Sequence, residues 1–368
     1  MKIICAKEEL VKGTQIVQAV VSPRSTLPIL ANFLIETEED KIKLSATDLE
    51  VGVVCYIKGE VVKEGSSTIP AKRFSDVVKE LADGSDIEIK SDESSQINVR
   101  SGKSHFVIMG LPKVDYPVLP SFPEEDIFEV SNQTLKMMIK STAFAVSTDE
   151  TRYTLNGVNI EIEKGLIKAV ATDGRRLAFI SREIPDKKVH KKAIIPTKAI
   201  NEIQRLLAQG KETDQIRIGV TENQVSFRLD GITVMSRLIE GNFPSYEQVI
   251  PKKYEAQIKL KTKETLSLVR QMALLVSDKT AIVKFLFGKN VLRISTTAQG
   301  LGSGEAEEDI EYSGPNLEIA FNPNFLIDIL KNVEDSDVFI ELTSPLNPAV
   351  IRPVKDKEYV YVIMPMRV

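Results

Sequence analysis

The feature that most constrains this chain is a repeat of its own sequence at an interval of about 125 residues. Residues 42–48 read Ile-Lys-Leu-Ser-Ala-Thr-Asp, and residues 167–173 read Ile-Lys-Ala-Val-Ala-Thr-Asp. Residues 292–297 keep a fainter form, Leu-Arg-Ile-Ser-Thr-Thr. A unit of this length can bury a core of its own, unlike the short repeats of solenoids, so each repeat is expected to be a domain.

An unrelated motif keeps the same interval. Pro70 and Pro196 each precede a helical pattern, and Asn322 stands in the same place in the third repeat, so the spacing is 126 residues both times. Two motifs with one period predict a chain of three similar domains, and the Pro-rich segments between the repeats are typical of domain linkers. We place the domains at residues 1–123, 124–252 and 253–368.

Each predicted domain contains two helical patterns among about eight short strands. In the second domain Leu135, Ile139 and Val146 recur at helical spacing, and residues 159–170 alternate about a Lys-Gly turn, as a hairpin does. The fold class is therefore α+β, with three similar domains that each pack two helices on antiparallel strands. The six helices are expected at residues 7–21, 72–81, 132–146, 198–208, 262–276 and 323–331.

Composition excludes several classes of protein. The chain is 42% hydrophobic and 27% charged, which is typical of soluble globular proteins. No apolar run approaches the length of a membrane span, and acidic residues follow the N-terminus too soon for a signal peptide. Cys5 and Cys55 provide no disulfide framework, and His105 and His190 no zinc-ligand pattern. We therefore expect a cytoplasmic protein without metal, cofactor or membrane contact.

Positive charge gathers on the predicted helices. Counted over residues 7–20, 72–81, 131–146, 198–208, 261–275 and 323–331, their formal charges sum to +6, whereas the whole chain carries −4. If the helices shared one surface, that surface would attract phosphates regardless of base sequence. A solvated polar face on each separate helix is the alternative interpretation.

The sequence contains no recognisable catalytic pattern. A phosphate loop, a nucleophile elbow and a paired-His zinc motif are all missing. Residues 300–304 are glycine-rich, but their spacing is wrong for a dinucleotide fingerprint and they are expected to form a loop. A non-catalytic protein is the first hypothesis. An enzyme built on a repeated scaffold is the alternative, and it would need carboxylates or a nucleophile converging between domains.

Five segments resemble signatures of one family, the bacterial sliding clamp, which is the β subunit of DNA polymerase III. They are residues 22–30, 152–157, 171–178, 238–246 and 361–368. The last segment, Tyr-Val-Ile-Met-Pro-Met-Arg-Val, is the most specific of the five. The resemblance extends over the whole chain.

The resemblance implies a processivity factor of chromosomal replication. Two chains would join head to tail in a ring of six units, with helices lining the hole and strands forming the rim. The ring would encircle double-stranded DNA, slide along it without base specificity, and tether the polymerase III α subunit, the clamp loader and repair proteins. A paralogue specialised for tolerance of an inhibitor is a further alternative.

The family's peptide-binding cleft carries over to the second half of the chain. An apolar pocket there would receive aliphatic or aromatic side chains of partner peptides, and flexible methionines would adapt to several partners. Arg175 and Phe325 depart from the family's common residues and could change which peptides bind best. The matching positions are Leu155, Thr172, Gly174, Arg175, Arg176, Leu177, Pro244, Val249, Asn322, Phe325, Leu346, Val362, Met364, Pro365, Met366 and Arg367.

Two further surfaces are expected. For DNA, the resemblance carries over Arg24, Arg152 and Tyr153. Charge and helical placement add Arg73, Lys136, Lys140, Lys198, Arg205, Lys263 and Arg270.

For the homodimer contact, apolar residues of the first domain would meet apolar residues of the partner's third domain, and basic residues would meet acidic ones. The apolar residues are Phe106 and Ile108 opposite Leu274 and Leu275. The charged residues are Lys72, Arg73, Arg100 and Lys103 opposite Glu305, Glu307 and Glu308.

Overall fold

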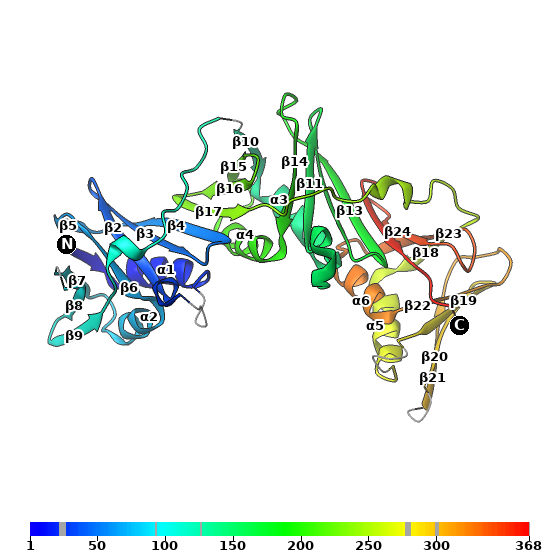
Figure 1. Ribbon diagram of the computed structural model, residues 1–368. Helices are drawn as coiled ribbons and strands as arrows, with labels where there is room; N and C mark the ends of the chain where they lie inside the picture. Colours follow the sequence, from blue (N-terminus) through cyan, green and yellow to red (C-terminus); the bar gives the residue numbers. More distant parts are fainter. Residues whose placement is uncertain (22–26, 93, 126, 277–280, 299–301, 368) are drawn as a thin grey trace. The chain divides into compact units, whose positions relative to one another are not determined.

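The structure is a computed structural model, and it describes residues 1–21, 27–92, 94–125, 127–276, 281–298 and 302–367. The chain divides into two compact units. Unit 1 contains residues 1–133 and 198–238, and unit 2 contains residues 134–197 and 239–368. The predicted α+β class with antiparallel sheets is confirmed in both units (Figure 1).

Two antiparallel sheets form unit 1, with strand orders β5-β1-β7-β8-β9 and β10-β15-β16-β17-β4-β3-β2-β6. Helix α1 packs beside α2 and covers β3 and β4. The strands are β1 Lys2–Ala6, β2 Asn32–Glu38, β3 Lys41–Thr47, β4 Val51–Ile57, β5 Glu60–Lys63, β6 Ser66–Pro70, β7 Asp86–Ser91, β8 Gln96–Ser101, β9 Ser104–Met109, β10 Ile127–Ser131, β15 Gln215–Val220, β16 Gln224–Leu229 and β17 Ile232–Arg237.

Unit 2 is built in the same way, with strand orders β14-β11-β12-β13-β25-β24-β23-β18 and β21-β20-β19-β22. Helix α5 packs beside α6 and against β19, β20 and β21 (Figure 1). The strands are β11 Gly157–Glu163, β12 Leu166–Thr172, β13 Arg176–Glu183, β14 Lys191–Pro196, β18 Ala256–Lys261, β19 Val283–Gly288, β20 Val291–Ala298, β21 Gly302–Asp309, β22 Leu317–Phe321, β23 Asp337–Leu342, β24 Ala349–Pro353 and β25 Tyr359–Ile363.

All six predicted helices are present in the described part of the chain. They are α1 Lys7–Gln18, α2 Ala71–Glu80, α3 Asn132–Thr142, α4 Thr197–Gln209, α5 Thr262–Ala273 and α6 Pro323–Asn332. The first, third and fifth end three or four residues earlier than expected. In each, the last amides bond to the carbonyl three residues back, which tightens the end into a 3₁₀ turn. No helix of the described residues is long and apolar enough to cross a membrane.

The repeat is also visible in the pairing of the strands. In unit 1 the order β6-β2-β3-β4 continues into β17, and in unit 2 the order β14-β11-β12-β13 continues into β25. Each eight-stranded sheet therefore joins strands of one predicted domain to strands of the next. The large buried side chains of these sheets, such as Phe33 and Tyr361, form the cores.

The Thr-Asp motif forms the same turn in both units. In unit 2 the Thr172 hydroxyl donates to the carbonyl of Arg176 at 2.6 Å and accepts from the amide of Gly174 at 3.1 Å. Asp173 accepts from the next two amides, those of Arg175 and Arg176. Gly174 has a φ of +84°, a left-handed conformation that glycine adopts without strain.

Unit 1 places a leucine where unit 2 has this glycine. The Thr47 hydroxyl donates to the Val51 carbonyl at 2.9 Å and accepts from the amide of Leu49 at 3.0 Å. Leu49 has a φ of +79°, which costs a side-chain-bearing residue about 1–2 kcal/mol. The turn geometry is thus retained in unit 1 at the cost of backbone strain.

We expect Leu49→Gly to stabilise the chain. The substitution removes the backbone strain of the folded state. Glycine also gives the unfolded chain more conformational freedom, which lowers the stability by about 0.4–1 kcal/mol. The free energy of unfolding should therefore rise by about 1 kcal/mol in total. Leu166→Gly is the control, because that exposed leucine lies in a strand at an ordinary φ and its loss should destabilise. Thermal unfolding followed by circular dichroism measures both. A lower melting temperature for Leu49→Gly would contradict the strain assignment.

Candidate functional site

A buried apolar cluster in unit 2 contains the centre of the predicted peptide site. We call it the Leu177 cluster, and its members are Leu155, Val170, Leu177, Ile194, Phe243, Tyr246, Val350, Val360 and Val362. Phe179, Ile239 and Ile250 pack against it. Three predicted site residues, Leu155, Leu177 and Val362, are thus buried together, although they lie on a 3₁₀ segment, β13 and β25.

Three other predicted apolar residues are exposed. Val249 is 49% exposed, Leu346 71% and Met364 44%. Val249 lies in the linker between two residues of the cluster region, Tyr246 and Ile250, and Met364 follows β25 directly. Exposed apolar side chains beside a buried apolar cluster are typical of a surface that binds another molecule.

The residues after β25 are held in place by backbone hydrogen bonds. The Met364 amide donates to the carbonyl of Arg175 at 2.9 Å, and the Met366 amide donates to the carbonyl of Ala320 at 2.7 Å. This tail of residues 364–367 therefore connects the Thr-Asp turn to β22. The side chains of Met364 and Arg367 are exposed, while Pro365 and Met366 are half-buried.

The side chain of Arg176 binds other residues of unit 2 and does not extend into solvent. Its guanidinium binds Asp173 at 3.1 Å, Asp328 of α6 at 2.6 Å and the carbonyl of Phe144 at 2.6 Å. It also lies over the ring of Phe325, 4.6 Å from the centroid. Arg176 and Phe325 thus join the turn to α6, and they position the site more than they offer groups to a ligand.

We expect Arg176→Ala to lower the unfolding free energy by about 2–4 kcal/mol, because it leaves half-buried carboxylates and a carbonyl without their cation. Arg175→Ala is the matched control. That neighbouring side chain is exposed, so its loss should change stability by less than about 0.5 kcal/mol. Denaturant unfolding measures both variants, and equal stability would contradict the role assigned to Arg176.

Some of the other predicted site residues stabilise the local backbone, and others are exposed on the surface. Thr172 is used inside the turn, and Asn322 caps α6 by accepting from the Asn324 amide at 2.9 Å. Pro244 is exposed in the linker. At Gly174, a Cβ atom would lie 2.8 Å from a guanidinium nitrogen of Arg152, so a larger residue there would displace that arginine.

Sequence reasoning missed several members of the cluster, above all Phe243, Tyr246 and Val360. Tyr246 donates its hydroxyl to Glu161 at 3.0 Å, and Lys192 binds the same carboxylate at 2.8 Å. Although burial favours the protonated form, these bonds and that from Asn159 lower the pKa of Glu161. The aromatic residues of the linker were the available signal, because aromatic side chains in a polar linker usually pack against something.

Most of the predicted DNA-facing residues are exposed. Those that are exposed and form no ion pair within the described part of the chain are Arg73, Lys136, Tyr153, Lys263 and Arg270. Arg152 is exposed and lies 3.8 Å from Asp149. Arg24 lies outside the described residues.

Three further predicted DNA-facing cations, besides Arg152, already have carboxylate partners. Lys140 binds Glu334 at 2.7 Å, and Arg205 binds the buried Glu202. Lys198 binds Asp48 of the first Thr-Asp turn and lies 3.6 Å from Glu50. Burial works against the charge of Lys198, but these carboxylates raise its pKa. The count of helix charge was therefore too simple, because residues outside the helices neutralise part of it.

Two of the predicted dimer residues are buried within the single chain. Ile108 is buried in its own sheet, and on β9 the exposed apolar side chains are Phe106, Val107 and Met109. Glu308 is buried as well, where it accepts from the Thr265 hydroxyl at 2.7 Å, and burial raises the pKa of its carboxyl. Which face of a strand points outward depends on the pairing of the sheet, and the sequence pattern alone did not indicate it for these two residues.

The remaining dimer candidates are accessible. Leu274 is exposed and Leu275 is half-buried, and Lys72, Arg100 and Lys103 are exposed. Glu305 and Glu307 are exposed on β21 and bind Arg293 of β20. The residues expected in a glycine-rich loop are partly in this strand, since β21 begins at Gly302, while 299–301 lie outside the described residues.

The described residues contain no clustered metal ligands, and both thiols are buried. Among the described residues, no group of three or more His, Cys, Asp or Glu side chains is placed to hold a metal ion. Cys5 and Cys55 are buried, and burial raises the pKa of each thiol to about 12.

Comparison with known proteins covers the whole chain. Models of the N-terminal, central and C-terminal domains of the DNA polymerase III β subunit match residues 1–120, 129–245 and 247–367. A β sliding clamp of Chlamydia pneumoniae is 34% identical over 368 residues, which is 100% of this chain and 99% of that protein. A β sliding clamp of Staphylococcus aureus is 32% identical over 357 residues, covering 94% of each chain.

Solved structures agree. The DNA polymerase III β subunit of Pseudomonas aeruginosa matches with a TM-score of 0.95 at 30% identity, over 100% of both chains. The sliding clamp of Bacillus subtilis matches with a TM-score of 0.94 at 30% identity, over 100% of this chain and 99% of that one. Another P. aeruginosa clamp structure contains bound griselimycin. With its α+β domains, its repeated sheets and these matches over its full length, the chain belongs to the DNA polymerase III β-subunit family, the β sliding clamps, which act as processivity clamps in DNA replication.

Proposed function

We propose that two copies of this chain join head to tail in a ring around duplex DNA, and that the ring tethers replication proteins to their template. Each copy would contribute three domains, at residues 1–123, 124–252 and 253–368. The ring would hold DNA by enclosing it, without catalysing a reaction and without reading its bases. Such a protein would work in the cytoplasm, where bacterial chromosomes are replicated.

The observation that carries this proposal is a pair of complementary sheet edges. Strand β9 ends one sheet of unit 1, and strand β21 ends one sheet of unit 2, so each has an edge with no strand partner among the described residues. Phe106 is exposed on β9, and basic Arg100 and Lys103 lie nearby on its hairpin. Acidic Glu305 and Glu307 are exposed on β21. Pairing β9 with β21 of a second copy would cover both edges and match their charges.

Contact with DNA would depend on the exposed cations of the helices. Arg73, Lys136, Lys263 and Arg270 carry no carboxylate partner among the described residues and could meet phosphates. Diffuse phosphate contacts of this kind carry no sequence information, which suits a protein that must move along the duplex. Lys198 and Arg205 would contribute less, because Asp48 and Glu202 already bind them.

The Leu177 cluster would hold the partners. Short segments of the polymerase α subunit, of the clamp loader and of repair proteins would place apolar side chains against Val249, Leu346 and Met364. The buried members of the cluster would support this surface, and the two methionines of the tail would allow side chains of different shape to fit.

We expect the purified chain to be a dimer at micromolar concentration and Phe106→Glu to weaken the dimer at least about thirtyfold, because a central apolar contact of an interface contributes about 2 kcal/mol or more. The control is Val62→Glu. It places the same charge on an exposed valine of β5, at the opposite edge of the same sheet, and should leave the dimer intact. Multi-angle light scattering measures the molar mass of each variant. A monomeric wild-type chain would exclude the closed ring, and with it the proposal that a closed ring holds partner proteins on the DNA.

A further inference from the structure

Unit 1 contains a counterpart of the Leu177 site. The strand sequence β3-β4-β17 in unit 1 corresponds to β12-β13-β25 in unit 2, with the same antiparallel register. Gly52 takes the position of Leu177, and Met235, its partner on β17, takes the position of Val362. The face of the sheet that supports the predicted peptide site is therefore present a second time.

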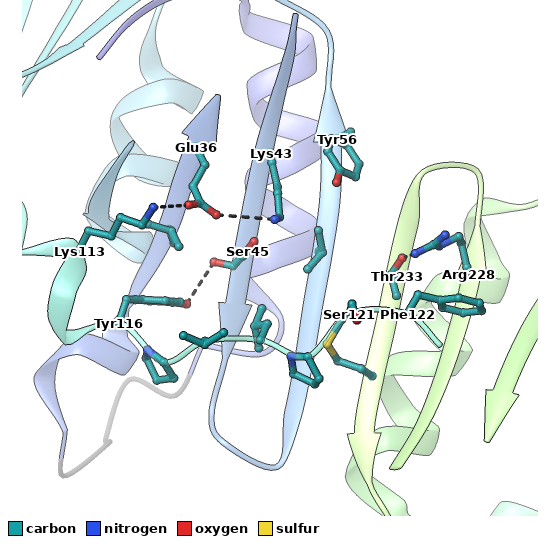
Figure 2. A pocket seen from close by; sticks show the side chains of 17 residues that line it. Glu36, Lys43, Ser45, Tyr56, Lys113, Tyr116, Ser121, Phe122, Arg228 and Thr233 are labelled. Atoms are coloured by element: carbon teal, nitrogen blue, oxygen red, sulfur yellow. Dashed lines mark hydrogen bonds and ion pairs between the residues drawn. The ribbon is translucent and has the colours of Figure 1, made fainter. Parts of the chain in front are cut away.

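A pocket of about 440 Å³ lies on this face (Figure 2). Its floor is the surface of β2, β3, β4, β16 and β17, and its cover is the linker segment of residues 113–122, which we call the strap. The apolar part of the lining includes Leu34, Val54, Leu119 and Met235. In unit 2 the corresponding space is filled by the Leu177 cluster. At Gly52 the space that a side chain would take is occupied by Leu119 and Met235, because a Cβ atom there would lie 2.8 Å from Leu119 and 3.0 Å from Met235.

Positive charge distinguishes this pocket from the Leu177 site. Three cations line it, Lys43, Lys113 and Arg228, against one carboxylate, Glu36. Glu36 binds Lys113 at 2.7 Å and lies 3.8 Å from Lys43 (Figure 2). A second carboxylate, that of Glu38, binds Lys43 at 2.5 Å. These ion pairs account for the two lysines and leave the arginine.

Arg228 is half-buried and has no carboxylate within ion-pair distance among the described residues. Its Nε donates to the Thr233 hydroxyl at 3.1 Å, and its guanidinium lies 4.1 Å from the centre of the Phe122 ring. Burial, followed by the charge of Arg217, lowers the pKa of Arg228. Burying a cation without a counter-charge is costly, and an anion in the pocket would offset that cost.

We propose that this pocket binds a short acidic segment of a partner protein, with an apolar side chain between the strap and the sheet and a carboxylate on Arg228. The ligand chemistry, a carboxylate joined to an apolar group, follows from the lining. The choice of a peptide over a free carboxylate follows from the repeat, since the counterpart in unit 2 is the proposed peptide site, and in that respect the inference rests on the proposed function.

The eight methionines of the chain make the test direct, because Met235 lines this pocket while Met364 and Met366 belong to the other site. The full chain is labelled with ¹³C at its methionine methyl groups and titrated with acetyl-Asp-Phe-Asp-amide. We expect a saturable shift of the Met235 signal, assigned with Met235→Leu. Acetyl-Asn-Phe-Asn-amide should bind at least about tenfold more weakly, because it lacks the charge-assisted bonds to the arginine.

Arg228→Gln should weaken binding of the acidic peptide about tenfold, and Arg228→Lys should weaken it less. The matched control is Arg217→Gln, which removes a cation from the neighbouring strand, 5.8 Å from the same Phe122 ring but outside the pocket lining, and should weaken binding much less than Arg228→Gln does. Circular dichroism of each variant checks that the fold is intact.

Four outcomes of these titrations would overturn the proposal. They are no Met235 shift at millimolar peptide, equal binding of the neutral peptide, equal loss in the Arg217 control, and binding of 3-phenylpropionate as tight as that of the peptide, which would make this a site for small carboxylates. The titration is repeated on a chain truncated after Ile363. A Met235 response that survives there supports a separate site whether or not the proposed function of the Leu177 site holds, and its loss would refute the inference.

Discussion

Once loaded by a clamp loader onto a nicked circular plasmid, the chain is expected to remain with the DNA through gel filtration, and cutting the plasmid once is expected to release it. A closed ring leaves a circle only by opening, but it can slide off a free end. Non-specific phosphate contacts alone give dissociation constants of about 10⁻⁴–10⁻⁶ M at physiological salt, which would not hold nanomolar protein on either form.

The dependence of retention on salt concentration distinguishes a chain that encloses the DNA from one that is held by affinity for it. A protein held by 6–10 phosphate contacts loses about 10³–10⁵ in affinity between 50 and 200 mM salt, whereas a threaded ring should stay on the circle over that range. Phe106→Glu is the control that should fail to remain on either form, because its ring cannot close. Equal retention of the wild-type chain on circular and linear DNA would show that affinity, and not topology, holds it.

Removal of residues 364–368 should abolish binding of partner peptides and leave the chain folded. The truncation takes away the exposed Met364 side chain beside the Leu177 cluster, together with Met366. We expect the affinity for a fluorescent peptide from the polymerase α subunit to fall at least about a hundredfold, since loss of the central apolar contacts of an interface costs several kcal/mol.

The fold should survive because the tail contributes little to the cores. In the described part of the tail, the truncation removes the backbone bonds from Met364 to Arg175 and from Met366 to Ala320, each contributing about 0.5–1.5 kcal/mol. Val62→Ala serves as a control for loss of an exposed apolar side chain elsewhere and should bind the peptide normally. Fluorescence anisotropy measures the affinities, and an unchanged value for the truncated chain would remove the tail from the site.

Local features of the fold could be predicted from the sequence. The helix of α2 is encoded by buried Phe74 and Val78 at helical spacing among exposed charged residues, and the Thr-Asp turns need only side chains and amides within four residues of each other. Such interactions depend on neighbouring residues alone, so they recur wherever the local sequence recurs. This is why the repeat predicted the domains and why the resemblance extended over all of them.

The candidate site could be predicted only in part. Leu155, Leu177 and Val362 are buried together as the resemblance implied, but nothing in their neighbourhood indicated that Phe243 and Tyr246 of the linker would join them. Such contacts depend on how the linker crosses the sheet. Arg176 shows the limit more sharply, because its partner Asp328 is 152 residues away and the sequence contains many other carboxylates that it could have bound.

By itself, the sequence determined that this chain consists of three similar α+β domains, and it placed the predicted peptide-binding residues in the second half of the chain. The tertiary structure decided which groups remain available for binding. It buried Ile108 and Glu308, paired Lys198 with Asp48, and left Arg228 under the strap with no carboxylate partner among the described residues. The physical reason is that the pattern of a strand sets its periodicity, whereas its neighbours in the sheet decide which side chains are covered and which charges are neutralised.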